Sequence, residues 1–392
     1  MDPVRSKRII YLVLGMLLLG FLIAAVYISL RPAEETKRPT QERVTSRLPE
    51  FLNIFGGEEI APEEKPAGKI AGAPEEKLIR ITDFPVVSPA LDAKGERLLF
   101  YKKDGGDLLS LDFNGQNQEK ISNKTIVGIV EVMWSPLKDR AAVFYLDGEI
   151  KKGFLHIGTS SVAVLPQNVL SFSWSPDGKS FAYLISQDDR LNLVTADSSA
   201  RNSRTIFTTP LPDASINWIT ADQVAFLTAP SGLAEGYLYL LSRAASTFQK
   251  VIGPLFGLSA LWSPDGSRVL TAATDAAGKN ISLAVHESSG QEIFFSGAKT
   301  LPEKCAWRGK NLIYCAVPRT IAPQGVFPDD YLSGEINTSD RILLLDLERK
   351  EAREILAEGS FDMANLLVSP DQKNLFFVNR ADGTLWMYRL VQ

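Results

Sequence analysis

The stretch SFSWSPDGKSFAYLI at residues 171–185 returns in altered form as SALWSPDGSRVLTAA at residues 259–273. Trp174 and Trp262 hold the same place in the two copies, and Trp218 lies halfway between them, 44 residues from each. Self-similarity at a fixed period of this size is typical of proteins built from repeated structural units. The chain is therefore predicted to be a repeat protein.

Five of the six tryptophans follow this period. They are Trp134, Trp174, Trp218, Trp262 and Trp307. Val87 and Val368 stand in the same slot at the two ends, so seven units are predicted. Their ranges are 85–125, 128–167, 168–210, 213–253, 257–298, 301–361 and 362–392. A large aromatic side chain at one register of every unit is expected to pack between neighbouring units.

Each unit has the pattern of four short strands. An apolar run ends in Trp or Val, a turn such as Ser-Pro-Asp-Gly follows, and an alternating run such as SFAYLI continues. Pro presets the turn and Gly accepts a positive φ at no steric cost. Four antiparallel strands repeated in series indicate blades, and blades set around a circle form an all-β propeller with short, protected edges.

The final unit contains only three strands before the sequence reaches Gln392. The run KLIRIT at residues 77–82 can supply the missing fourth strand, because it lies just ahead of the first unit. This pairing would join the two ends of the domain. The prediction is a seven-bladed β-propeller over residues 77–392, closed by an N-terminal strand that completes the last blade.

The motif WSPDG followed by an alternating strand resembles the PD40, or WD40-like, repeat of TolB-type bacterial propellers, over residues 85–392. The resemblance implies the fold and says little about function, because propellers support many activities. The chain departs from TolB in lacking a preceding α/β domain, in having seven units instead of six, and in carrying an apolar anchor. The partners of TolB are therefore not expected here.

Residues 9–30 contain no charge over 22 residues. As a helix they would span about 33 Å, which is enough for a hydrocarbon core of about 30 Å. Arg5, Lys7 and Arg8 precede the stretch, so residues 1–8 are expected in the cytoplasm. The prediction is an uncleaved signal-anchor, a single-pass helix in the cell membrane with the propeller on the extracytoplasmic side.

Residues 31–76 contain six prolines and many charges. Such a composition buries too little apolar surface to offset the entropy of the chain, so a disordered Pro/Glu-rich linker is predicted. Its one apolar patch, residues 48–55, is either an exposed patch in a linker or a short docking segment.

The composition bears on partners and chemistry. A net charge of −4 and a pI near 5.5 argue against nucleic acid as a partner. The chain has two histidines and lacks the Gly-x-Ser-x-Gly, His-Glu-x-x-His, phosphate-loop and Cys-x-x-Cys motifs. No catalytic, cofactor or metal site is therefore predicted. Enzymatic activity remains an open alternative, since propeller active sites collect single residues from several blades.

The sixth unit is longer than the others, and the excess lies at residues 317–340, between its second and third strands. In a propeller this connection emerges on the face opposite the Ser-Pro-Asp-Gly turns. Long ordered loops are commonly functional, so Phe327, Asp329, Asp330 and Tyr331 are candidate partner-binding residues. An idle surface loop and a metal or catalytic role are the alternatives, although the acidic residues lack the spacing of a calcium loop.

Both cysteines belong to the same unit. Cys305 and Cys315 flank the turn RGKN and fall on neighbouring antiparallel strands, nearly opposite each other. Outside the cytoplasm two cysteines in this arrangement can oxidise, so a cross-strand disulfide is expected.

These features predict a membrane-anchored, non-catalytic binding or scaffolding module. Its partner would be a protein or an envelope polymer, engaged through the face that carries residues 317–340. A hydrolase or lyase acting on peptide or glycan at the channel mouth is the alternative from another class. A mainly structural component of the envelope is the third interpretation.

Overall fold

The computed structural model describes residues 77–122, 124–158, 161–356 and 359–390. All the regular secondary structure of these residues is β-strand, apart from two single-turn helices, η1 (Pro302–Lys304, 3-10) and α2 (Asp329–Leu332). The predicted cytoplasmic segment, transmembrane helix and linker, residues 1–76, lie outside the described part. Within that part, no helix has the length and apolar character needed to span a bilayer.

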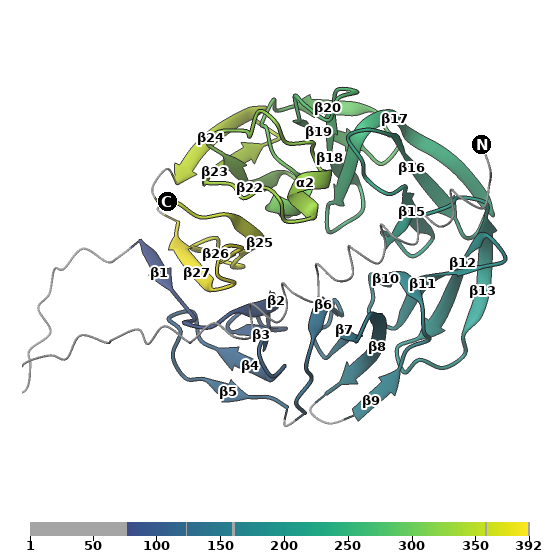
Figure 1. The fold of residues 1–392 in the computed structure, drawn as a ribbon, viewed down its shortest axis with the longest axis horizontal. Helices are drawn as coiled ribbons and strands as arrows, with labels where there is room; N and C mark the ends of the chain where they lie inside the picture. The colour runs from purple at the N-terminus through teal and green to yellow at the C-terminus, as the bar shows by residue number, and fades with distance from the viewer. Residues whose placement is uncertain (1–76, 123, 159–160, 357–358, 391–392) are drawn as a thin grey trace, which may run out of the picture. The chain divides into compact units, whose positions relative to one another are not determined.

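In the described residues the strands form six antiparallel sheets (Figure 1). The first sheet contains β2 (Val86–Leu91), β3 (Leu98–Lys102), β4 (Leu108–Leu111) and β5 (Glu119–Lys120). The second contains β6 (Ile129–Trp134), β7 (Arg140–Asp147), β8 (Ile150–Ile157) and β9 (Ser161–Val164). The third contains β10 (Val169–Trp174), β11 (Ser180–Gln187), β12 (Arg190–Asp197) and β13 (Arg204–Thr209). The fourth contains β14 (Ser215–Trp218), β15 (Gln223–Leu227), β16 (Glu235–Ser242), β17 (Thr247–Trp262), β18 (Arg268–Thr274), β19 (Ser282–Glu287) and β20 (Glu292–Phe295). The fifth contains β21 (Cys305–Arg308), β22 (Leu312–Pro318), β23 (Asp340–Asp346) and β24 (Glu351–Leu356). The sixth contains β25 (Met363–Val368), β26 (Asn374–Asn379), β27 (Leu385–Arg389) and, from the start of the domain, β1 (Leu78–Arg80).

The sheets of this domain stand around a ring, with the first strand of each sheet near the centre and the last at the rim (Figure 1). The seven-stranded sheet differs from the prediction of separate units at 213–253 and 257–298. Strand β17 runs without interruption for 16 residues; it pairs with β16 up to Phe256 and with β18 from Phe256 onward. Gly253 and Gly257 adopt positive φ values of 107° and 64°, which lets one strand turn from one set of partners to the next.

The predicted closure of the ring is confirmed. Strand β1 pairs with β27 in antiparallel register, with Leu78 opposite Tyr388 and Arg80 opposite Trp386. Beyond the strand, the Ile81 amide donates to the Leu385 carbonyl at 2.8 Å. The N-terminal strand therefore covers what would otherwise be the exposed edge of the last sheet.

The repeated turn motif has a local physical basis. The Ser175 hydroxyl donates to the Asp177 carboxylate at 2.7 Å and accepts from the Ser180 amide at 3.0 Å. Gly178 follows with φ of 67°. Ser263 with Asp265 and Ser369 with Asp371 make the same side-chain contact in later repeats. The serine and aspartate thus close the turn, while glycine takes the conformation that other residues avoid.

The register tryptophans lie between neighbouring sheets. Trp174 belongs to a buried cluster that joins residues of the β6–β9 sheet to residues of the β10–β13 sheet. Its indole N–H donates to the Met133 carbonyl of the preceding inner strand at 2.8 Å. Trp134 and Trp307 make the equivalent bond to the preceding strand, at 2.8 and 3.0 Å.

Trp218 is buried to the same degree as Trp174, at 6% exposure, but its bonding differs. Its indole N–H has no hydrogen-bond partner among the described residues, and the Arg243 guanidinium lies 4.6 Å from the ring centroid. Trp262, 8% exposed, packs in the cluster shared by the two halves of the β14–β20 sheet.

We expect Trp174→Phe to lower the free energy of unfolding more than Trp218→Phe, by about 1–3 kcal/mol, in denaturant titrations of the full chain. Both variants lose a similar ring volume at the same burial. Only the first leaves a buried carbonyl, that of Met133, without its donor. Equal losses would show that the inter-sheet hydrogen bond contributes nothing measurable.

Candidate functional site: the loop face

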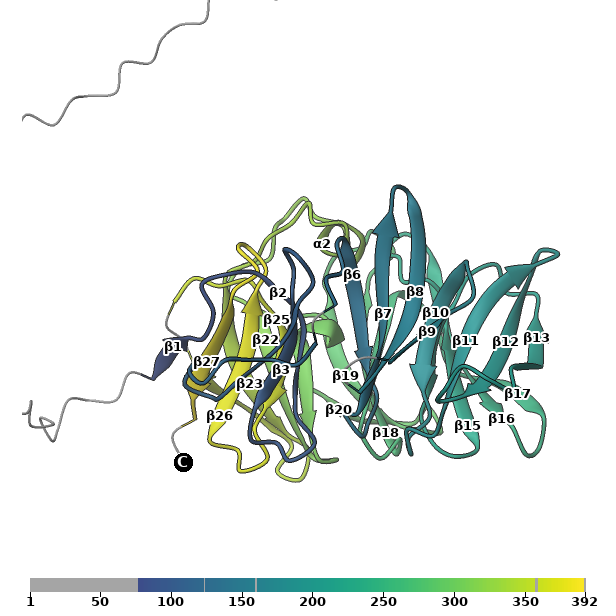
Figure 2. The same cartoon turned by 90° about the horizontal axis from the view of Figure 1, so that it is seen from below.

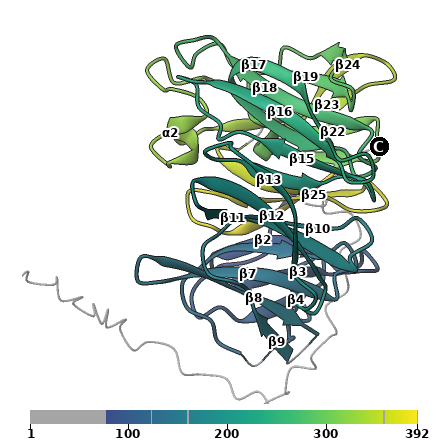
Figure 3. The same ribbon diagram turned by 90° about the vertical axis from the view of Figure 1, so that its right-hand side faces the viewer.

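One face of the ring carries the connections between second and third strands; we call it the loop face. The 319–339 loop, which includes α2, and the tip of the β7–β8 hairpin project from it together (Figures 2 and 3). The Ser-Pro-Asp-Gly turns lie at the other ends of the inner strands, on the opposite face. The long loop therefore emerges on the side that the sequence predicts.

The loop is folded back onto the ring. Phe327 is 3% exposed and packs in the core between the β14–β20 and β21–β24 sheets. Its amide donates to the Gly278 carbonyl at 2.9 Å. The Asp330 carboxylate accepts from the Val326 amide at 2.7 Å, which fixes the start of α2. Both side-chain and backbone contacts therefore hold the loop against the ring.

A second attachment joins the loop to the connection between β15 and β16. The Asp329 carboxylate accepts from the Ser231 hydroxyl at 2.8 Å and from the Gly232 amide at 2.7 Å. A Cβ atom placed on Gly232 would lie 2.3 Å from the Phe327 carbonyl oxygen. Glycine is therefore required here for the close approach of the two loops.

The third attachment is a buried charged cluster that the sequence did not predict. The Lys304 ammonium, at the end of η1, is 2.7 Å from Asp362 Oδ1 and 2.8 Å from Asp340 Oδ2. It also donates to the Tyr331 hydroxyl at 3.0 Å and to Thr338 Oγ1 at 2.8 Å. Both aspartates and the lysine are at most 2% exposed.

Arg380 completes this cluster from the β25–β27 sheet. It donates to the Tyr331 carbonyl at 3.1 Å and lies 3.7 Å from Asp362 Oδ2. The guanidinium carbon is 4.1 Å from the centroid of the Tyr331 ring, and the Lys304 ammonium is 4.6 Å from it. Two cations thus lie close to one tyrosine ring, and the electron-rich face of the ring attracts them.

The ionisation of this cluster follows from its geometry. Burial alone would lower the pKa of Lys304, but the negative charges of Asp340 and Asp362 raise it above its usual range. Burial disfavours the charged form of Asp362, yet the Lys304 ammonium and hydrogen bonds from Thr338 hold its pKa below normal. Burial dominates at Asp340 and raises its pKa. We infer a charged lysine at neutral pH, held by the carboxylates of both Asp340 and Asp362.

The predicted binding residues therefore hold the loop in place. Phe327 and Tyr331 are each 3% exposed, so neither offers a contact surface in this structure. Asp329 and Asp330 are partly exposed and are bonded within the fold. Binding of a partner by these four residues stays a prediction. The only sequence signal for the Lys304 cluster is a lysine directly before an inner strand, which carries no indication of its partners.

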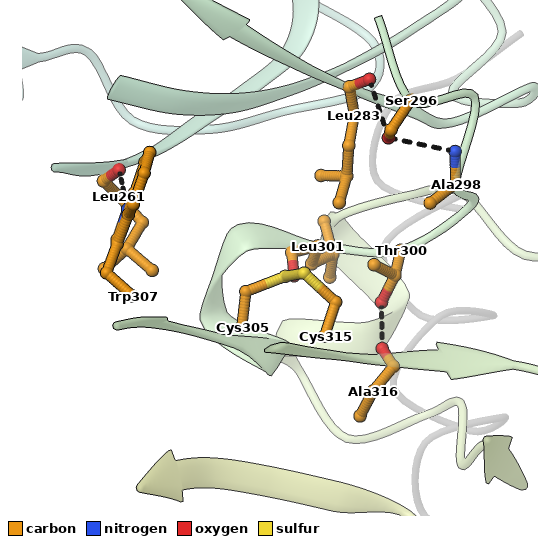
Figure 4. The surroundings of a disulfide bond; sticks show 10 residues. All are labelled: Leu261, Leu283, Ser296, Ala298, Thr300, Leu301, Cys305, Trp307, Cys315 and Ala316. Atoms are coloured by element: carbon orange, nitrogen blue, oxygen red, sulfur yellow. Dashed lines mark hydrogen bonds between the residues drawn. A yellow bond between two sulfur atoms is a disulfide. The ribbon is translucent and has the colours of Figure 1, made fainter. Parts of the chain in front are cut away.

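The loop-bearing sheet contains a disulfide between Cys305 and Cys315 (Figure 4). The two residues are directly opposite in the pairing of β21 with β22, with their Cα atoms 4.1 Å apart. Both are buried beside Leu301 (Figure 4). The bond joins the inner strand that follows Lys304 to the strand from which the loop departs.

Large apolar side chains are exposed at the strand ends and connections of the loop face. Seven of the eleven exposed large hydrophobic residues found in the described part of the chain lie there. They are Val127, Val130, Leu146, Ile150, Leu170, Leu233 and Leu332. Leu137 lies on the opposite face, and the other three lie on the rim strands β9 and β20. Exposed apolar groups collected on one face are typical of an interaction surface.

Within the described residues, no group of three or more His, Cys, Asp or Glu side chains has an arrangement suited to a metal ion. The two histidines lie apart in different sheets. The Tyr101 hydroxyl lies 2.6 Å from His156 Nδ1, and Thr271 Oγ1 lies 3.0 Å from His286 Nε2.

No family model matches the chain, and no curated protein matches it in sequence. Among solved structures, an oligogalacturonate lyase from Vibrio parahaemolyticus is similar with a TM-score of 0.59 at 12% identity, covering 80% of this chain and 94% of that one. The β-propeller domain of the Trilobed protease from Pyrococcus furiosus gives 0.53 at 13% identity, covering 78% and 95%. TolB from Acinetobacter baumannii gives 0.44 at 13% identity, covering 70% and 64%.

These likenesses show the fold. The domain is an all-β propeller, as the repeat and its PD40 resemblance predict, and the lyase and the protease propeller share this fold. An oligogalacturonate lyase and a domain of a protease share this architecture, and a propeller fold supports many functions, so the likeness does not separate a binding role from an enzymatic one.

We expect Lys304→Met to lower the free energy of unfolding at pH 7 by about 3–5 kcal/mol, because two buried carboxylates lose their cation. The loss should shrink as the pH falls toward 4. Above pH 4 the wild type keeps the contribution of Asp362, because the pKa of this carboxyl in the folded protein lies below its usual range. The two buried carboxylates of the variant have lost their cation, so they take up protons as the pH falls and the penalty of their burial is relieved.

Denaturant titrations of the full chain at several pH values measure this difference. Lys310→Met is the matched control, since Lys310 is exposed in the turn between β21 and β22. A loss for Lys304→Met that is independent of pH would contradict the charged state assigned to the cluster.

Proposed function

We propose that this protein is a membrane-anchored binding module without catalytic activity. Residues 9–30 would anchor it in the cell membrane, residues 31–76 would act as a linker, and a seven-bladed propeller would stand on the extracytoplasmic side. The count of seven takes β17 as the last strand of one blade and the first of the next. The partner is a protein or an envelope polymer that contacts the loop face.

The observation that carries this proposal is the attachment of the long loop. Its contacts reach the sheets on both sides: Asp329 bonds to Gly232 of the β14–β20 sheet, and Tyr331 contacts Arg380 of the β25–β27 sheet. A loop held at several points presents its exposed side chains in one fixed geometry. Preorganisation of this kind lowers the entropy lost on binding, so it favours recognition.

The loop face also offers apolar anchors beside these attachments. Leu332 on α2 is 48% exposed, and Leu233 is 64% exposed next to the serine and glycine that contact Asp329. Apolar side chains at the centre of a contact commonly supply much of its binding energy.

A capture experiment tests the proposal. The full chain, immobilised in detergent, is incubated with envelope extract, and the retained partners are identified by mass spectrometry. We expect the double variant Leu233→Glu with Leu332→Glu to retain at least tenfold less of the partner than wild type, because charge replaces apolar contact area.

Leu137→Glu is the matched control, because Leu137 is 51% exposed on the opposite face. It should retain the partner as wild type does. Retention that is equal for wild type, the double variant and the control would reject the loop face as the binding surface.

A second candidate is a hydrolase or lyase acting on glycan or peptide at the channel mouth. One residue favours it. Glu303 lies in η1, which directly precedes an inner strand and contacts β17 and β25; the residue is reached by solvent on one side, while protein surrounds it on the others. Desolvation by the surrounding protein nevertheless raises the pKa of its carboxyl. A carboxyl with a raised pKa beside an inner strand can serve as a general acid or base.

This second candidate predicts turnover of polygalacturonate or of a protein substrate by the wild-type chain. Loss of a general acid or base costs roughly 10²–10⁴-fold, so Glu303→Gln should lower the rate by at least about a hundredfold. Product formation followed over pH 4–9 measures it. A wild-type chain without turnover on either substrate class would exclude this candidate.

A further inference from the structure

Two adjacent cavities lie at the base of the long loop. The larger, of about 540 Å³, is bounded by residues 297–299 after β20, by the end of β22 and by the start of β23. The smaller, of about 200 Å³, continues along the loop toward Phe327. Lys299 and Ile321 line both. The two cavities therefore form one elongated groove between the β14–β20 sheet and the loop.

Among the described residues that line this groove, the charged ones are basic. Lys279, Lys299, Arg319 and Arg341 line it, and no aspartate or glutamate belongs to the described lining of either cavity. The protein as a whole carries a net charge of −4. A positive groove on an acidic protein is a local feature, and its field attracts an anionic ligand.

Three of the groove cations, Arg341, Lys279 and Lys299, differ in their described partners. Arg341 pairs with Glu354 at 2.7 Å, and its Nε has no hydrogen-bond partner in the described part of the chain. Lys279 donates to the Gly325 carbonyl. Lys299 is exposed, and no carboxylate of the described residues lies within ion-pair distance of it. The Arg341 Nε is itself buried, whereas the exposed ammonium of Lys299 is available to a bound carboxylate.

The remaining lining is aliphatic. Val317, Ile321, Leu343 and Pro323 contribute to it, while the aromatic Phe327 is 3% exposed. An aliphatic wall suits aliphatic side chains of a peptide, whereas sugar rings prefer an open aromatic face for stacking. Elongated shape, aliphatic wall and basic charge together favour an extended peptide with acidic and aliphatic residues.

We propose that the groove of Lys279, Lys299, Arg319 and Arg341 binds an extended acidic segment of a partner protein. This inference rests on the proposed binding function and names the chemistry of the partner. The carboxylates of the segment lie against the basic side chains, and its aliphatic residues lie against Val317, Ile321 and Leu343. Since the groove is open to solvent, binding weakens as salt screens the charges.

Selection from a random-peptide display library on the immobilised full chain tests the proposal. We expect peptides selected on wild type to be enriched in Asp and Glu. The best of them, made synthetically, should bind at least tenfold more weakly to Lys299→Glu and weaken with rising salt. Lys299→Ala gives an intermediate loss and confirms that the effect does not require an introduced negative charge.

Lys310→Glu is the matched control, because it changes the same charge on an exposed residue at the opposite face. Selected peptides without acidic enrichment, or equal binding to Lys299→Glu and Lys310→Glu, would overturn the proposal. Binding of polygalacturonate that depends on Lys299, without peptide binding, would replace the acidic peptide by an acidic polysaccharide.

The test is separate from that of the binding function. If Lys299→Glu retains the partner from envelope extract while the Leu233→Glu, Leu332→Glu variant loses it, the groove assignment fails and the loop face remains the binding surface.

Discussion

The pairing of β1 with β27 is the constraint on which the ring depends. The backbone of Leu385 donates to the Thr82 hydroxyl across a separation of 303 residues. Without that strand the last sheet would present an unpaired edge, and the two ends of the domain would have no common sheet. Every other sheet of the described residues is formed by strands that follow one another along the chain, so the pairing of these strands is set locally. The pairing of β1 with β27 then closes the ring.

Three sheets of the closed ring surround the base of the long loop. The buried charged cluster of Lys304 then fixes the position of that loop on the ring. Lys304, Asp340 and Asp362 come from different elements, η1, β23 and the segment before β25. Burying three charges is costly, and a hydrophobic cluster could provide comparable stability. The charges instead require specific partners, which fits a loop that must adopt one position, with its Tyr331 held by Lys304 and Arg380.

Both proposals about function depend on the position of the long loop. The same loop that contacts Gly232 and Arg380 also forms one wall of the basic groove at Lys299 and Ile321. A propeller fold permits binding and catalysis alike, as the lyase and protease propellers of similar architecture illustrate. In this chain, one insertion in one sheet builds the surface on which both proposals rest.

The sequence by itself determined the repeat, the strand order, the inter-sheet place of the tryptophans and the closing strand, because these follow from local periodicity and turn chemistry. It also placed the two cysteines opposite each other. The direction of Phe327 and Tyr331 and the partners of Lys304 were decided only by the tertiary structure. These contacts join residues from separate sheets, and no local pattern records which side chains a closed ring brings together.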